Sequence, residues 1–338
     1  MILNDSSWKR LNTFDTNVVL LDGLTGTGKT MIMRILDTYS SVTPPKFNYQ
    51  LEQILIGINI GEIGKDFGMQ LLQLLLDQIQ YDLAIGREIN LRPRDLSSVL
   101  SSTKRFVYLS NLLKSDGSSV KERILKKNQD LLLVTHQLLD AATTINCIPG
   151  KTLTHILCVR HPYFLVAHWE SYIPMQGKSP TDFQLINGIT PWFIKEFKDV
   201  YASLNTKERA MCSIIEATNK SLDFIEQGTS NLLVFDFEKF VLNPNRYLEL
   251  LSEALPSPDN RRLKKVLRAE KLPRSHISDS VVRAIYKRYG SETLSTKHQH
   301  NEDYKIMRER SKLDVDLGIY NAFEVMAKRY ESMFGLWF

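Results

Sequence analysis

Cysteine is scarce in this chain, and the chain has no long hydrophobic run. Its 338 residues include three cysteines, at positions 147, 158 and 212, and their spacing matches neither a disulfide framework nor a zinc site. The longest apolar stretch, Leu71–Leu76, is interrupted by polar residues, so the sequence predicts no membrane span. The opening residues MILNDSSWKR lack the apolar core of a signal peptide. We therefore expect a soluble, cytoplasmic protein.

A strong excess of one charge is also missing. The formal net charge is +5, with 24% charged and 43% hydrophobic residues, which is typical of globular proteins. This mild positive charge suits an anionic cofactor or substrate but is too weak to indicate nucleic-acid binding. There are no repeats and no low-complexity tract. The length fits one large α/β domain, and we expect a single domain over residues 1–338.

A phosphate-binding loop is the most informative motif. Residues 23–30 read GLTGTGKT and fit the pattern GxxxxGK[ST], with an apolar run before them and a helical pattern after them. Because Gly26 and Gly28 have no side chain, backbone amides can approach phosphate oxygens closely. The helix that follows points its positive end at the anion. Lys29 adds a cation, and Thr30 can bind a phosphate oxygen or a metal. The sequence therefore predicts a site for a phosphate-bearing molecule.

The remaining elements alternate in the manner of a three-layer α/β fold. Buried strands are predicted at 16–22, 131–135, 153–159 and 231–237, and helices at 29–40, 203–228 and 311–335. Residues 50–130 read as a helical insertion after the first unit. Residues 256–310 are basic and polar without a clear period, and we expect a long loop over the site with some helix at 281–289. The sequence thus predicts a central parallel sheet of four or five strands with P-loop NTPase-like topology.

Two further strands end in residues that can do chemistry. The strand at 131–135 is followed by His136, and the strand at 153–159 is followed by Arg160. In open α/β sheets, ligands bind at the carboxyl ends of the strands. We therefore expect His136, Arg160 and the phosphate loop to lie at one edge of the sheet.

This order of motifs resembles the sulfotransferases that use 3'-phosphoadenosine 5'-phosphosulfate. The resemblance rests on Gly26–Thr30, on Val134–Leu138 (VTHQL), on Arg160–Phe164 (RHPYF), and on Asp236–Phe240 (DFEKF) followed by a proline. The family has a cation ahead of the loop glycine, a lysine before the Thr-His pair and a serine in the helix after its arginine. Here those places hold Gly26, Val134 and His168. The family's late Arg-Lys-Gly motif has its nearest counterpart in the basic stretch 261–274.

The resemblance implies a role for each site residue. Lys29 and His136 are the implied catalytic residues, with His136 as the base that takes a proton from an acceptor hydroxyl or amine. The implied cofactor contacts are Gly26, Thr27, Gly28, Lys29, Thr30, Arg160 and His168. Sulfuryl transfer requires no obligatory metal in this scheme. The insertion at 50–130 and the loop at 256–310 would form a pocket for a glycan or a small metabolite.

Two other interpretations remain open. Lys29 occupies the position of the phosphate-loop lysine in ATP- and GTP-dependent kinases and NTPases, and Asp236, after four apolar residues, could bind a metal in such an enzyme. The substituted motif positions are also compatible with a protein that binds a nucleotide without catalysis. The sequence leaves the acceptor and the oligomeric state open.

Overall fold

The structure is a computed structural model, and it describes residues 14–338 except 88, 94, 96–97, 115–118, 179–184, 187, 230 and 278–298. The strands are β1 (Thr16–Gly23), β2 (Lys46–Phe47), β3 (Leu131–Val134), β4 (Lys151–Val159), β5 (Leu185–Ile186), β6 (Thr190–Pro191) and β7 (Leu232–Asp236). The helices before β4 are α1 (Lys29–Leu36), α2 (Tyr49–Asn59), α3 (Lys65–Ile85), α4 (Arg105–Asn111) and α5 (Ser119–Lys127). Those after β4 are α6 (Val166–Tyr172), α7 (Thr206–Glu226), α8 (Phe237–Leu242), α9 (Pro244–Ala254), α10 (Asn260–Ala269), α12 (His300–Lys312) and α13 (Leu317–Phe334). Short 3-10 turns complete the description.

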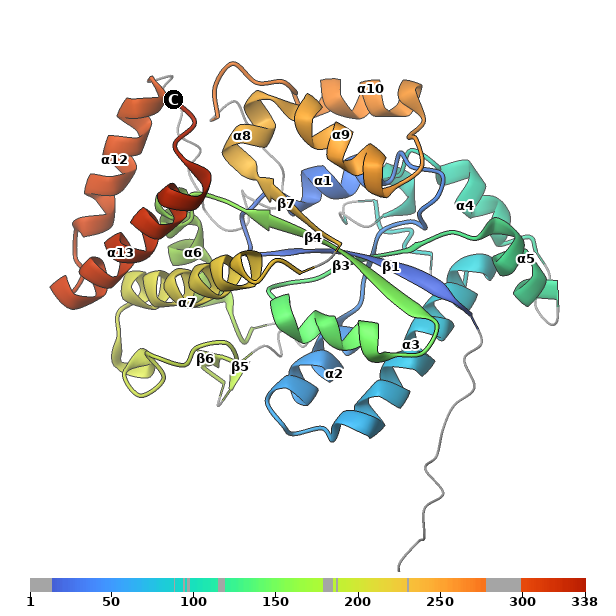
Figure 1. The fold of residues 1–338 in the computed structure, drawn as a ribbon, viewed down its shortest axis with the longest axis horizontal. Coiled ribbons are helices and arrows are strands. Elements are labelled where there is room, and N and C mark those ends of the chain that lie inside the picture. The colour runs from blue at the N-terminus through green and yellow to red at the C-terminus, as the bar shows by residue number, and fades with distance from the viewer. Residues whose placement is uncertain are drawn as a thin grey trace, which may run out of the picture.

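A five-stranded sheet in the order β2-β3-β1-β4-β7 forms the centre of the molecule. All four strand pairings are parallel, and Leu20 of β1 lies opposite Leu133 of β3 and His155 of β4. Helices α1, α9 and α10 lie above the sheet in Figure 1, and α2, α3 and α7 lie below it. The predicted fold class, a parallel sheet between helical layers, is therefore confirmed.

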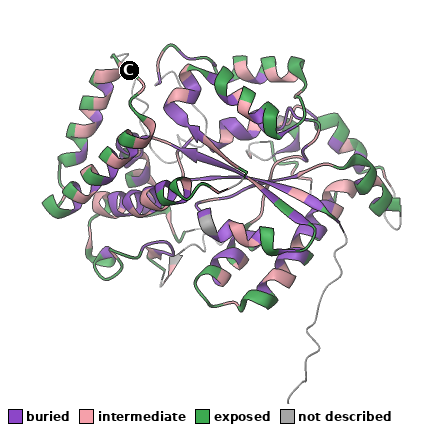
Figure 2. Ribbon diagram, in the orientation of Figure 1, coloured by how far each residue is buried: buried purple, intermediate pink, exposed green. Residues whose placement is uncertain are grey.

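Burial explains why the central strands are continuous apolar runs. A strand in a parallel sheet is covered on both faces, so its residues need not alternate between apolar and polar. Val18–Leu21 of β1 are completely buried, and so is Ile156 of β4. Figure 2 shows the strands as the buried centre and the outer sides of the helices as the exposed surface. The same hydrophobic cluster reaches Leu72 of α3 and Phe323 of α13.

Strand prediction succeeded for the four longer strands of the sheet, because each is a buried run of apolar residues. It missed β2, which has only two residues and pairs with β3 through Lys46 and Phe47. The helical insertion is confirmed, with α2 to α5 at its described positions. The described helices end or begin within several residues of the predicted bounds: α1 ends at Leu36 and α13 begins at Leu317.

The expected long loop at 256–310 is wrong where the structure describes it. Helix α10 occupies Asn260–Ala269 and is capped by the Asp259 side chain, which accepts hydrogen bonds from the amides of Arg261 and Arg262. Its apolar stripe consists of Leu263, Val266 and Leu267 among charged neighbours, too narrow to stand out in the sequence. Helix α12 occupies His300–Lys312. The predicted helix at 281–289 lies outside the described residues.

Candidate functional site

The phosphate loop leaves β1 at Gly23 and enters α1 at Lys29, at the edge of the sheet where the parallel strands end. Consecutive loop carbonyls accept hydrogen bonds from side chains. Lys29 Nζ donates to the carbonyls of Gly23 and Leu24. Trp169 Nε1 donates to the Thr25 carbonyl at 3.0 Å. Helix α1 begins directly after this loop, and the first amides of a helix, together with its positive end, suit an anion.

Two glycines of the loop have both a conformational and a steric reason to be glycine. Gly26 and Gly28 have φ angles of 97° and 89°, which side-chain-bearing residues rarely adopt. A Cβ at Gly26 would lie 2.8 Å from Cδ2 of His168, and a Cβ at Gly28 would lie 2.5 Å from Cδ2 of Phe237. The loop is therefore packed tightly between α6 and the start of α8.

Lys29 is a buried cation, and the buried carboxylate of Asp22 is its counter-charge. Burial lowers the pKa of Lys29, although the charge of Asp22 acts to raise it. Asp22 is fully buried and accepts hydrogen bonds from Thr135 Oγ1 at 3.2 Å and from the Leu139 amide at 2.8 Å. His155 Nε2 lies 3.8 Å from its carboxylate. Burial alone would raise the pKa of Asp22, but His155, Lys29 and the Leu139 amide lower it overall.

The loop threonines differ in their surroundings. Thr27 is buried, and its hydroxyl donates to the Leu24 carbonyl at 2.8 Å, so its proton stabilises the loop. Thr30 lies in the first turn of α1 and is half-buried. Of the two hydroxyls, that of Thr30 is thus the better placed for an anion.

His136 follows β3 and is held by a carboxylate that the sequence analysis missed. Oε1 of Glu52, on α2, lies 3.0 Å from His136 Nδ1 and also accepts a hydrogen bond from the His136 amide at 3.1 Å. Glu52 is buried, whereas the His136 side chain is 28% exposed and stacks on Phe47. With Nδ1–H directed at Glu52, the lone pair of the imidazole is on Nε2. This arrangement orients a histidine for proton transfer.

Glu52 could have been noticed in the sequence. It lies beside Leu51 and three positions before Leu55, within the stripe that α2 buries. A carboxylate in a buried stripe is uncommon unless it has a partner. No local pattern identifies that partner, because His136 lies 84 residues further along the chain.

Arg160 and His168 both contact the phosphate loop at Gly26. Arg160 donates from a guanidinium NH2 group to the Gly26 carbonyl at 2.9 Å, and its Nε lies 3.5 Å from Glu238. The His168 ring lies against Gly26. Burial, followed by the positive charges of Arg160 and Lys29, lowers the pKa of His168 to about 4. His168 is therefore neutral at pH 7 unless an anion joins it.

Three residues that the sequence analysis did not assign complete this side of the loop. The Arg160 guanidinium lies 4.4 Å from the centroid of the Phe237 ring, and the Arg274 guanidinium lies 5.9 Å from it. Arg274 is buried and belongs to the basic stretch 261–274. Glu238 accepts a hydrogen bond from the His161 amide at 3.1 Å, and burial together with the Asp236 charge raises the pKa of Glu238 to about 8.

Asp236, the candidate metal ligand of a kinase, caps the N-terminus of α8. Its Oδ1 accepts a hydrogen bond from the Lys239 amide at 3.3 Å and caps α8. Within the described part of the chain, no cluster of three or more His, Cys, Asp or Glu side chains could hold a metal ion. None of the helices searched there is long and apolar enough to cross a membrane.

Comparison with solved structures found matches that include two sulfotransferase domains. One is the sulfotransferase domain of the Synechococcus PCC 7002 olefin synthase, with 14% identity, a TM-score of 0.41, and coverage of 91% of this chain and 100% of that one. The other is a sulfotransferase domain of the curacin biosynthetic pathway, with 13% identity, a TM-score of 0.43, and coverage of 96% and 99%. No protein-family profile and no curated sequence matches the chain. Because both likenesses are distant, we take the function from the geometry of this chain's own site.

Gly28→Ala tests the tight packing of the loop, with Gly61→Ala as a matched control. Both glycines have positive φ angles, 89° and 83°, but a Cβ at Gly61 meets nothing within 4 Å. Gly61→Ala should cost only the backbone strain, about 1–2 kcal/mol in chemical denaturation. Gly28→Ala should cost more and should weaken phosphate binding at least tenfold, because Phe237 must move. Equal effects of the two variants would contradict this packing.

Proposed function

We propose that this chain is a sulfotransferase that moves a sulfuryl group from 3'-phosphoadenosine 5'-phosphosulfate to a hydroxyl or amine acceptor. The observation that carries the proposal is the convergence of a phosphate loop with a carboxylate-held histidine. His136, oriented by Glu52, follows β3, and Lys29 lies in the loop after the neighbouring strand β1. Because β1 and β3 are parallel neighbours, the residues that follow them lie at the same edge of the sheet, which supports a shared site for Lys29 and His136.

The residues at the loop fit a cofactor with two anionic ends. The glycines at 26 and 28 leave no room for a Cβ, and the amides of the first turn of α1 suit the 5' phosphosulfate. Arg160 and His168 flank Gly26 and would hold the 3' phosphate, as the family resemblance implies. Arg274 adds a further buried cation beside Phe237. When bound, the cofactor supplies an activated sulfuryl group.

The chain's own residues would then perform two tasks. The amide end of α1 and Lys29 stabilise negative charge on the leaving phosphate oxygen, because fixed donors in a site with little water interact strongly with developing charge. His136 Nε2 takes the proton that the acceptor hydroxyl or amine loses as its new bond to sulfur forms. Glu52 stabilises the imidazolium that results, and its hydrogen bond to the His136 amide fixes the position of the ring.

Calorimetry with purified protein tests the proposed cofactor. Adenosine 3',5'-bisphosphate should bind with or without magnesium, and Arg160→Ala should weaken it far more than it weakens adenosine 5'-phosphate, which lacks the 3' group. Magnesium-dependent binding of ATP or GTP without binding of the bisphosphate would favour a kinase or NTPase instead. Binding of the bisphosphate without turnover of any acceptor would favour a non-catalytic nucleotide-binding protein.

The pH dependence of bisphosphate binding tests the place of His168. A phosphate against His168 favours its protonated form and so raises its pKa from about 4 in the unliganded protein. Affinity should therefore increase as the pH falls from about 6.5 towards 4. His168→Asn should remove this increase and leave the affinity at pH 8 nearly unchanged. The same pH dependence in both proteins would place the phosphate elsewhere.

The kinetics of His136 and Glu52 variants test the proposed base. His136→Asn should lower kcat by roughly a hundredfold or more, with bisphosphate affinity nearly unchanged. Glu52→Gln should lower kcat by about 10–100-fold, because the amide stabilises the imidazolium less than the carboxylate does. Glu62→Gln, an exposed acid after α2, is the matched control. A fully active His136→Asn enzyme would exclude this residue as the base.

A further inference from the structure

A surface away from the phosphate loop combines exposed apolar side chains with a basic helix face. Helix α4 and the residue pair after it expose Phe106, Val107, Leu112 and Leu113, with exposed fractions of 74%, 47%, 49% and 90%. Helix α10 exposes Arg261, Lys264, Lys265 and Arg268. We call these eight residues the basic–apolar surface. Single exposed apolar residues are normal, but a projecting group of them indicates an interaction.

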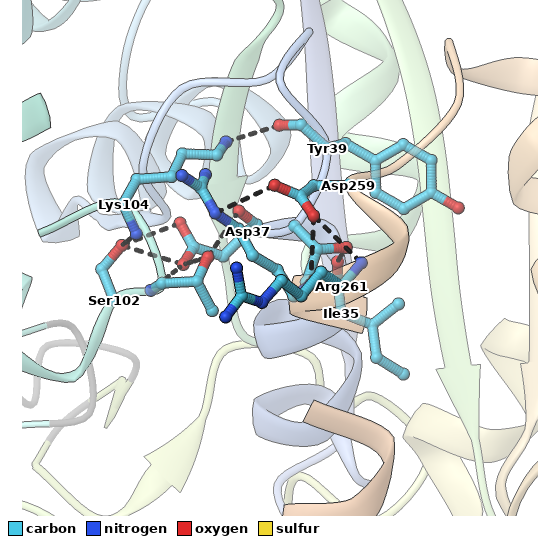
Figure 3. A network of polar contacts seen from close by, with 10 residues as sticks. Ile35, Asp37, Tyr39, Ser102, Lys104, Asp259 and Arg261 are labelled. Atoms are coloured by element: carbon cyan, nitrogen blue, oxygen red, sulfur yellow. Dashed lines mark hydrogen bonds and ion pairs between the residues drawn. The ribbon is translucent and has the colours of Figure 1, made fainter. Parts of the chain in front are cut away.

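The two helices of this surface are neighbours. The Lys104 side chain, at the start of α4, is buried and donates to the Val42 carbonyl at 3.3 Å and to that of Tyr39. The Asp259 amide, at the start of α10, donates to the Thr38 carbonyl at 3.0 Å. Both helices thus begin at the C-terminal end of α1. Figure 3 shows Lys104 and Arg261 on either side of this junction, and α4 and α10 lie next to each other in Figure 1.

The exposed charged residues of α10 are basic. Residues 259–271 contain six basic residues, namely Arg261, Arg262, Lys264, Lys265, Arg268 and Lys271, and two acidic ones, Asp259 and Glu270. Asp259 caps α10 and pairs with Arg262 at 3.2 Å, and Glu270 is buried in an ion pair with Arg34. Within the described residues, Lys264, Lys265 and Arg268 form no ion pair, so their charge faces solvent.

Two further cations lie beside the apolar side chains of α4. Lys114 directly follows Leu113, and its Nζ donates to Asn111 Oδ1 at 2.5 Å. Next to the apolar side chains themselves, the Arg105 guanidinium lies 5.1 Å from the centroid of the Phe106 ring. The apolar group is thus bordered by basic residues, a composition typical of elements that lie in a membrane interface.

We propose that the basic–apolar surface docks on an anionic lipid bilayer, with Phe106 and Leu113 entering the interface and the α10 cations lying against lipid phosphates. Phe106 and Leu113 are largely exposed, so a protein partner would need pockets shaped to receive them. A fluid bilayer accepts projecting apolar groups without such pockets. The cations supply complementary charge for anionic headgroups.

Vesicle sedimentation with the full chain tests this proposal. The protein should bind phosphatidylcholine vesicles that contain phosphatidylserine, bind pure phosphatidylcholine far less, and dissociate at high salt because salt screens the charges. The double variant Lys264→Gln, Lys265→Gln should weaken binding by roughly 25-fold, about five-fold per charge. Its matched control is Lys195→Gln, Lys198→Gln, at two exposed lysines beyond this surface, and it should bind as the original protein does.

A second pair of variants separates lipid docking from simple polyanion binding. Phe106→Ser, Leu113→Ser should weaken vesicle binding at least tenfold, whereas Leu317→Ser, Val325→Ser, at two other exposed positions, should not. Binding to heparin should be insensitive to both pairs. Failure to bind anionic vesicles at low salt would overturn the proposal. Vesicle binding that does not change in Phe106→Ser, Leu113→Ser would also overturn it and indicate recognition of a soluble polyanion.

Discussion

The shape of the phosphate loop depends on hydrogen bonds from side chains to its consecutive carbonyls. Lys29 holds the first two, Trp169 holds that of Thr25, and Arg160 holds that of Gly26. Two of these three side chains follow β4, more than 130 residues after the loop. These contacts form only when β4 lies beside β1, so the loop is supported in this way only in the folded sheet.

The folded sheet also brings together the charged side chains around the phosphate loop. Three cations, Lys29, Arg160 and Arg274, gather at the loop. The buried Asp22 carboxylate balances Lys29, and Arg160 donates to the Gly26 carbonyl at 2.9 Å and lies 3.5 Å from Glu238. A buried charge is costly unless it is paired and hydrogen-bonded. The cations are therefore fixed before any ligand binds, which reduces the reorganisation needed when a phosphate enters.

Local patterns explain which parts of the fold could be predicted. The sheet edge, with its loop, His136 and Arg160, follows from apolar runs that end in polar residues, and the structure brings the loop, Arg160 and His168 together. Helix α10 was missed because its charged residues conceal a narrow apolar stripe. Glu52 was not assigned because its partner is distant in sequence, and a pair of this kind leaves no local period.

The sequence by itself determined the phosphate loop, the parallel α/β architecture and the candidate residues at the strand ends, because each depends on a few consecutive residues. Only the tertiary structure decided which groups support them. Glu52 orients His136, Phe237 and His168 close the loop against Gly28 and Gly26, and α4 lies beside α10 at the surface. The physical reason is that hydrogen bonds, ion pairs and close packing between distant segments are specified by the folded backbone and by no short stretch of sequence.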